Sequence, residues 1–269
     1  MTKPRIIFYL GNRAASYAIS AVIITSVTVA LVLVASMFAY QVLEQQRGMT
    51  EFDVAKDSIL AFDDALQNVA WKPDASRSVR FTAKYGGLEL IPNGAVLIVN
   101  TTVEGVNRTV YSGGMGFVKY YIPTKYVNFG QGYQEYILGN ASLLVAKNTE
   151  SYGRAVVEQA SNYVTATLNY RVRTMRTSVT MVSGTKVNYV EIWVIKVSIP
   201  QFLSYAYDFD LKARCLNVTS TSWGPYDVGS SCTVSAQFGS GSQPSSATIS
   251  LDPGQVVFNV VVSEVRVAV

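Results

Sequence analysis

The chain has 269 residues, a formal net charge of +4, no histidine and two cysteines, and 49% of its residues are hydrophobic. Without histidine, a Ser-His-Asp or Cys-His relay and a histidine-ligated zinc or iron site are excluded. The small positive charge is spread thinly, so composition predicts no nucleic-acid partner. The carboxylates form no recognisable acid/base pair or metal site, and we expect neither enzymatic activity nor a cofactor.

An uncharged, strongly apolar run from Ala14 to Leu43 dominates the N-terminal part. A bilayer core about 30 Å thick is crossed by about 20 helical residues, so the run is long enough to span it with some tilt. Conventional secretory signals have only about 7 to 15 apolar residues, and we therefore expect this segment to remain in the mature protein. Flanking charges favour a cytoplasmic N-terminus and an extracellular C-terminal domain: Lys3, Arg5 and Arg13 before the run, Glu44 and Arg47 after it.

A second helical segment is predicted over residues 50–72. Gly48 can end one helix, with a hinge there, and Thr50 can cap the next. Apolar residues then recur at alternating spacings that place them on one stripe, which packs on the protein's own sheet or on a neighbouring subunit. The stripe is Phe52, Ala55, Ile59, Phe62, Leu66 and Val69, with Lys56, Asp57, Asp63, Asp64 and Gln67 elsewhere on the helix.

From Ser76 onward, short alternating or apolar runs are separated by Gly, Pro and Asn, which predicts strands and turns. The clearest hairpin covers residues 163–199, with its turn at Ser183-Gly184-Thr185. The last strand is predicted over residues 256–269, with the final residue paired. About ten strands predict a mainly β fold class, with a long membrane-spanning helix followed by one antiparallel β-sandwich over residues 76–269.

Two kinds of side chain fit an exterior location for the β-rich part. Cys215 and Cys232 flank a loop, and an exterior pair usually forms a disulfide; the alternative is two buried thiols. N-x-S/T sequons, which are glycosylation signals in exterior domains, occur at Asn100, Asn107, Asn140 and Asn217.

Two further patterns have competing interpretations. Asp208 and Asp210 point to the same side of a strand and could share a calcium ion, but calcium takes six to eight oxygen ligands, which favours a solvated strand face and no metal site. Residues 120–133 are rich in aromatic side chains and broken by Gly and Pro. They form a contact surface for a partner or glycan, or else they are half-buried sandwich tyrosines.

The sequence Arg13-Ala14-Ala15-Ser16-Tyr17-Ala18-Ile19-Ser20-Ala21-Val22-Ile23 resembles the class III signal and first helical turn of archaeal type IV pilins and archaellins. The resemblance covers the helical part and the general architecture, and no diagnostic motif lies in the β-rich part. It implies that a prepilin peptidase removes a basic leader, residues 1–14. It further implies that the helix, residues 15–46, packs with other pilin-like subunits.

In this resemblance Arg13 is the basic residue before the cut, Ala14 the small residue at the cut, and Ala15 the new N-terminus. Two positions depart from the family pattern. The Ser-Pro that often follows the archaeal site is Ser16-Tyr17 here, and Ile19 stands where bacterial pilins have glutamate.

Together these features predict a membrane-anchored, pilin-like structural subunit of a surface filament, as a main or minor component. The alternative is a permanently anchored single-span surface receptor or a ligand- or glycan-binding protein. A third hypothesis, an exterior hydrolase, rests only on isolated carboxylates and serines. Cleavage of the leader separates the first two.

Overall fold

The computed structural model describes residues 12–146, 150–239 and 242–269, without the side chains of residues 12–16 and 18. The chain divides into two compact units, Met1–Arg47 and Gly48–Val269. The described part of the first unit is helical. The second, called the sheet unit below, contains the rest of the same helix and all the strands.

The helix α1 runs without a break from Asn12 to Ala70. The predicted helix end at Gly48 and restart at Thr50 are therefore wrong. Gly48 is buried within the helix, and a Cβ built on it would lie 2.6 Å from the Cβ of Tyr126. The glycine allows the helix and Tyr126 to approach closely, although glycine within a helix costs about 1 kcal/mol relative to alanine.

The predicted apolar stripe on α1 is confirmed and packs on the protein's own sheet. Its six residues, from Phe52 to Val69, are each exposed by 2% or less. The Phe62 ring lies 6.3 Å from that of Phe81, and the Phe52 ring lies 6.1 Å from that of Tyr120. This stripe and the inner face of the sheet form one hydrophobic core.

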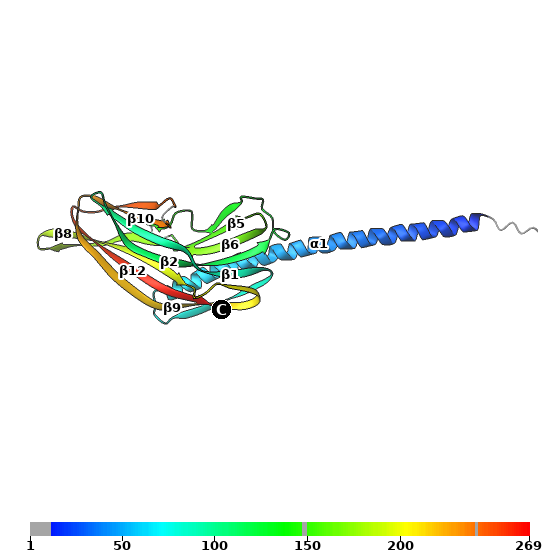
Figure 1. Cartoon of the computed structure of the whole chain (residues 1–269), viewed down its shortest axis with the longest axis horizontal. Coiled ribbons are helices and arrows are strands. Elements are labelled where there is room, and N and C mark those ends of the chain that lie inside the picture. Colours follow the sequence, from blue (N-terminus) through cyan, green and yellow to red (C-terminus); the bar gives the residue numbers. More distant parts are fainter. Residues whose placement is uncertain (1–11, 147–149, 240–241) are drawn as a thin grey trace, which may run out of the picture. The chain divides into compact units, whose positions relative to one another are not determined.

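The strands of the sheet unit belong to one 12-stranded sheet (Figure 1). They are β1 (Ser76–Val103), β2 (Val106–Pro123), β3 (Gln134–Leu138), β4 (Leu144–Val145), β5 (Gly153–Gln159), β6 (Tyr163–Tyr170), β7 (Val172–Val182), β8 (Thr185–Ser198), β9 (Leu203–Val228), β10 (Ser231–Phe238), β11 (Ser245–Ser250) and β12 (Gly254–Ala268). The order is β3-β5-β6-β2-β1-β9-β12-β8-β7-β4, with β10 paired to β1 and β11 to β10.

The sheet is mixed, so the predicted purely antiparallel sandwich is wrong although the mainly β class is confirmed. β12 runs parallel to β8, and β4 runs parallel to β7. Three strands, β9, β10 and β11, separate β8 from β12 along the chain. Such a separation is expected because two parallel strands must be joined by a crossover connection. The alternation of apolar residues within β12 predicts a strand but does not show that its neighbour is the parallel strand β8.

The sheet curves so that β2 approaches the end of β8, although the two strands are not neighbours in it. A Cβ built on Gly116 of β2 would lie 2.8 Å from Cδ1 of Ile199, the residue that follows β8. Irregular pairing bends the long strand β1 between Ala83 and Leu88 and again between Ile91 and Ala95. This curvature wraps the sheet around the buried stripe of α1.

The predicted hairpin over residues 163–199 is confirmed in part. β7 and β8 pair across the turn at Ser183-Gly184, where both residues have positive φ. β6, however, pairs with β2 and β5 rather than with β8. The last strand ends at Ala268, so the prediction that the final residue, Val269, is paired is wrong.

Candidate functional site

The apolar part of α1 is fully exposed. Every side chain from Ile19 to Gln41 is exposed, and Val34 and Phe38 are each 68% exposed. Among the described residues, α1 is the one helix whose length and composition would allow it to cross a membrane. A contiguous apolar surface of this kind marks a site of contact with lipid or protein, and we take it as the candidate functional site.

Four hydroxyl side chains within this segment, those of Thr25, Ser26, Thr28 and Ser36, are satisfied inside the helix. The hydroxyls of Ser26, Thr28 and Ser36 each donate to the carbonyl oxygen four residues earlier, at 2.7 Å. Such bonds remove the cost of carrying a hydroxyl into hydrocarbon, where water cannot serve as a partner. The segment is therefore compatible with lipid along its length despite these residues.

The residues of the expected leader cut lie at the edge of the described structure. The backbone of Arg13, Ala14 and Ala15 belongs to α1. Their side chains, and leader residues 1–11 as a whole, lie outside the described residues. The cut therefore stays a prediction from the sequence.

A buried carboxylate fastens α1 to the sheet just inside the sheet unit. Glu51 is 8% exposed, and its two carboxylate oxygens accept hydrogen bonds from the backbone N–H groups of Lys84, Tyr85 and Gly86 at 2.9–3.2 Å. The Tyr120 hydroxyl donates to Oε1 of Glu51 at 2.8 Å. The bend in β1 leaves these N–H groups without strand partners, and Glu51 supplies the acceptor. Sequence reasoning missed this contact.

Asp63 makes a second polar contact between α1 and the rest of the sheet unit. The sequence placed it off the buried stripe, yet it is 5% exposed, because the chain at Ser151-Tyr152-Gly153 covers it. Its Oδ2 accepts from Nε2 of Gln67 at 2.6 Å and from the Ser151 hydroxyl at 3.5 Å. Burial raises the pKa of Asp63 to about 6, against the lowering effect of the Gln67, Tyr170 and Ser151 side chains.

The C-terminal end of α1 explains why the predicted disulfide is wrong. Cys215 and Cys232 are both buried free thiols. The Cys215 thiol donates to the carbonyl oxygen of Ala70 at 3.2 Å, and the Ser263 hydroxyl also donates to this oxygen. The two side chains thus satisfy a helix-terminal carbonyl that has no partner within the helix.

The two cysteines also lie beside opposite ends of β1. The Cys215 N–H donates to the Ala75 carbonyl oxygen just before β1 begins, whereas Cys232 lies next to Thr233, which pairs with Thr102 near the end of β1. Burial raises the pKa of the Cys232 thiol to about 11. Both residues therefore fit the alternative interpretation of buried thiols.

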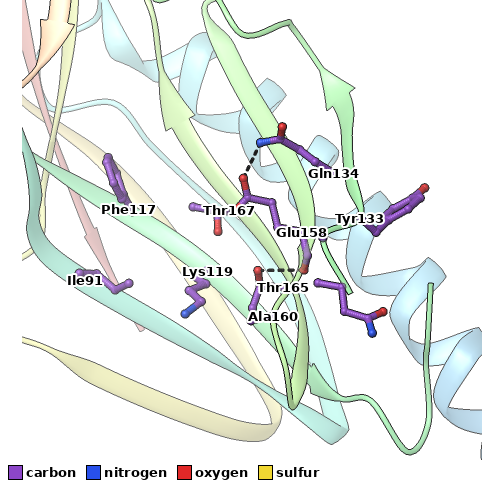
Figure 2. A pocket seen from close by; sticks show the side chains of 11 residues that line it. Ile91, Phe117, Lys119, Tyr133, Gln134, Glu158, Ala160, Thr165 and Thr167 are labelled. Carbon is purple, nitrogen blue, oxygen red and sulfur yellow. Dashed lines mark hydrogen bonds between the residues drawn. The ribbon is translucent and has the colours of Figure 1, made fainter. Parts of the chain in front are cut away.

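A surface pocket of about 530 Å³ lies on β2, β5 and β6 beside residues 132–134 (Figure 2). Phe117 and Ile91 supply apolar surface, and Lys119, Glu158 and Thr167 supply polar groups. Nε2 of Gln134 donates to Oε1 of Glu158 at 2.7 Å. The mixture of two aromatic rings, Phe117 and Tyr133, and several polar groups suits a small polar ligand.

The aromatic segment 120–133 leads into this pocket. Tyr120 is fully buried, whereas Tyr121, Tyr126 and Tyr133 are half-buried. The Gln159 side chain orders the segment, because its Oε1 accepts from the N–H groups of Phe129 and Gly130 at 2.6 and 3.0 Å. The half-buried interpretation is confirmed, and the exposed ring edges remain available for contact.

Three of the four sequon asparagines are exposed: Asn107, Asn140 and Asn217. Asn100 is half-buried within β1, and its Oδ1 accepts from the Thr109 hydroxyl at 2.8 Å. The exposed three are the better acceptors for a glycan, since the transferase must reach the side-chain amide nitrogen.

Asp208 and Asp210, the candidate calcium ligands, lie exposed on β9. Oδ1 of Asp208 accepts from the Thr82 hydroxyl at 2.8 Å, and Oδ2 lies 3.6 Å from the Arg80 guanidinium. The hydrogen bond from Thr82 lowers the pKa of Asp208. These contacts describe the solvated strand face that the sequence favoured.

In comparisons with protein-family models, curated proteins and solved structures, nothing matches this chain. The fold consists of a long apolar N-terminal helix followed by a large mixed β-sheet. The fold and the exposed helix therefore define a class of protein in which one apolar helix precedes a β-sheet domain.

Proposed function

We propose that the protein is a membrane-anchored, pilin-like structural subunit of a surface filament, with its N-terminus in the cytoplasm and its sheet unit outside the cell. The observation that carries the proposal is the exposed apolar segment from Ile19 to Gln41. Leu, Ile, Phe and Val each favour the bilayer centre by about 0.3–0.6 kcal/mol, so a run of this length favours insertion.

The way α1 is built into the sheet unit favours a structural subunit over a simple anchor. A receptor needs only a linker between its anchor and its binding domain. Here the same helix that carries the apolar segment also supplies the buried stripe of the core, and it is fastened by Glu51, Asp63 and the Ala70 carbonyl. Such a connection transmits force from the helix to the sheet, as a filament requires.

The partners proposed for this protein follow from the same arrangement. In the membrane the apolar helix contacts lipid, and in a filament it contacts the corresponding helices of other pilin-like subunits. A prepilin peptidase removes the leader between Ala14 and Ala15. Glycans on Asn107, Asn140 and Asn217 cover part of the exterior surface.

The state of the N-terminus in the mature protein tests this proposal. N-terminal sequencing of protein from native membranes or filaments should find Ala15 first. A cut after Gly11 is disfavoured, because it leaves Arg13 at the head of a segment that lies among apolar helices, where a charge costs about 2.5 kcal/mol or more. An intact Met1 or Thr2 in the surface-exposed form would defeat the pilin-like function and favour the permanent anchor.

The pocket of Figure 2 favours a second function, binding of a small polar ligand such as a glycan. Glycan-array screening of the full chain in detergent tests it. Replacing Phe117 by Ala should abolish any binding that depends on the pocket, whereas Phe202→Ala, at an exposed position outside the pocket, should leave it unchanged.

A further inference from the structure

One end of the sheet unit carries a cluster of tyrosines and lysines, which we call the tyrosine belt. It comprises Tyr85, Tyr121, Tyr126, Tyr163 and Tyr207 together with Lys84 and Lys125. Part of the belt contacts the first residues of α1 that belong to the sheet unit. Gly48 packs on Tyr126, and Glu51 binds the backbone of Lys84 and Tyr85.

Ring contacts join four of the belt tyrosines in two pairs. The Tyr85 and Tyr126 rings are 4.9 Å apart, and the Lys125 ammonium lies 4.3 Å from the centre of the Tyr126 ring. In the second pair, the centres of the Tyr121 and Tyr163 rings are 5.6 Å apart. Tyr207 pairs with Ala83, directly before Lys84.

The belt exposes aromatic surface that the fold does not use. Tyr163 is 45% exposed and Tyr207 is 71% exposed. Tyr207 also has a φ of +67°, a conformation that non-glycine residues seldom adopt. A strained position that presents an exposed ring indicates a contact outside the folded unit.

Chain length limits how far this end of the sheet unit can lie from the apolar segment. The apolar run ends at Leu43, and Gly48 is five residues later. Five residues span about 8 Å as a helix and at most about 18 Å when fully extended. Because each headgroup layer is about 5–8 Å thick, a Leu43 at the edge of the hydrocarbon core puts residue 48 between the headgroup layer and about 13 Å beyond it.

We propose that the tyrosine belt rests in the lipid headgroup layer on the exterior side of the membrane. Tyrosine favours this layer because its ring is apolar and its hydroxyl is polar, and lysine ammonium groups there pair with lipid phosphates. The belt holds the sheet unit against the bilayer before any assembly. This inference rests on the membrane anchoring in the proposed function.

The test measures quenching of a fluorescent bimane label by lipids brominated near the headgroup. The full chain is reconstituted in vesicles of phosphatidylcholine and phosphatidylglycerol. Labels are placed on single introduced cysteines beside the belt, at Asn162→Cys and Ala206→Cys, both exposed positions. Met181→Cys is the control, 64% exposed and separated from the belt end by the length of β8, roughly 45 Å. Unsubstituted protein reports any labelling of the buried Cys215 and Cys232.

We expect brominated lipid to reduce the emission of both belt labels about twofold and to leave the Met181→Cys label unchanged. A label at Leu33→Cys, in the apolar segment, is read with lipids brominated deep in the acyl chains, and it separates the two proposals. If it is quenched and the belt labels behave like Met181→Cys, the belt inference is overturned and anchoring stands. If the Leu33→Cys label is not quenched, anchoring fails and the inference fails with it.

A second variant distinguishes the contribution of the tyrosines from that of the chain connection to the apolar segment, which by itself keeps the sheet unit near the membrane. Replacing both Tyr163 and Tyr207 by Ser in the Ala206→Cys chain should remove most of the quenching. Tyr189→Ser, at a half-buried tyrosine of β8, is the matched control and should leave quenching unchanged. Equal quenching in the double variant and in this control would show that chain connectivity alone places the label, and it would overturn the inference.

Discussion

Glu51 and Asp63 are both buried on α1, but hydrogen-bond donors surround them to different extents. Glu51 accepts from three backbone N–H groups and one hydroxyl. Asp63 accepts from two side chains, and its Oδ1 has no hydrogen-bond partner among the described residues. A buried carboxylate with many donors holds structure together, whereas one with few donors is a cost that pH can relieve.

Replacing Glu51 by Ala should destabilise the sheet unit. The substitution leaves the N–H groups of Lys84, Tyr85 and Gly86 without an acceptor, at a cost of about 3 kcal/mol or more. Chemical unfolding of the full chain in detergent, followed by tryptophan fluorescence, measures this loss. Asp57→Ala, at an exposed position on the same helix, should change stability by less than about 0.5 kcal/mol. Equal stability of the two variants would contradict the role given to Glu51.

The raised pKa of Asp63 predicts a pH dependence with a definite sign. Because the pKa of Asp63 is about 6 in the folded chain and 3.8 for an unperturbed aspartate, the folded state binds the proton more tightly. Protonation of Asp63 therefore raises the free energy of unfolding as the pH falls through 6. Above pH 6 the buried charge lowers the free energy of unfolding by about 3 kcal/mol.

Asp63→Asn should remove this dependence. The difference in unfolding free energy between variant and unsubstituted protein should be greater at pH 7.5 than at pH 5 by roughly 1 kcal/mol. Asp64→Asn, on the exposed neighbour, should show no such change. A pH-independent difference for Asp63→Asn would show that the carboxylate is not buried as described.

At the scale of elements, β12 is a central strand rather than a tail. It pairs with β9 on one side and β8 on the other. Ser263, Val265 and Val267 are fully buried, and Ser263 also reaches the Ala70 carbonyl oxygen. The strand thereby joins the two halves of the sheet and the end of α1.

Deleting residues 261–269 should abolish cooperative unfolding, because it splits β9 from β8 and exposes the core. Circular dichroism during heating of the full chain and of the truncated chain measures this. Removing Val269 alone, which is 48% exposed and lies outside β12, is the control and should leave the transition intact. An undiminished transition in the longer deletion would contradict the central place of β12.

Elements with a local period could be predicted from the sequence, and contacts between distant segments could not. The stripe from Phe52 to Val69 follows from helical spacing alone. The parallel partner of β12, the N–H donors around Glu51 and the bond from Cys215 to Ala70 all depend on residues far away along the chain. Gly48 was misread because glycine marks a helix end in sequence but here serves a close contact.

For the candidate site, the same distinction holds. Hydropathy alone located the apolar segment, since the signal is local and long. The pocket of Figure 2 brings together β2, β5, β6 and residues 132–134, and of its two aromatic residues the sequence pattern singled out Tyr133 but not Phe117. The predicted disulfide failed because composition and compartment indicate that cysteines pair but do not say where the fold places them.

One helix serves two environments in this protein. Its residues Ile19 to Gln41 are exposed and apolar, and its stripe from Phe52 to Val69 is the core of the sheet unit. Membrane anchoring and the exterior position of the sheet unit are the central claim. Leader removal, glycosylation and the tyrosine belt all depend on it.

Labelling of intact cells tests this claim most directly. Met181→Cys places a reactive thiol on the exposed turn region of β7 and β8, while Cys215 and Cys232 are buried. A membrane-impermeant maleimide should label this variant on intact cells, and the labelled protein should stay with the membranes after extraction with alkaline carbonate. Labelling only after lysis, or release of the protein by carbonate, would contradict the account.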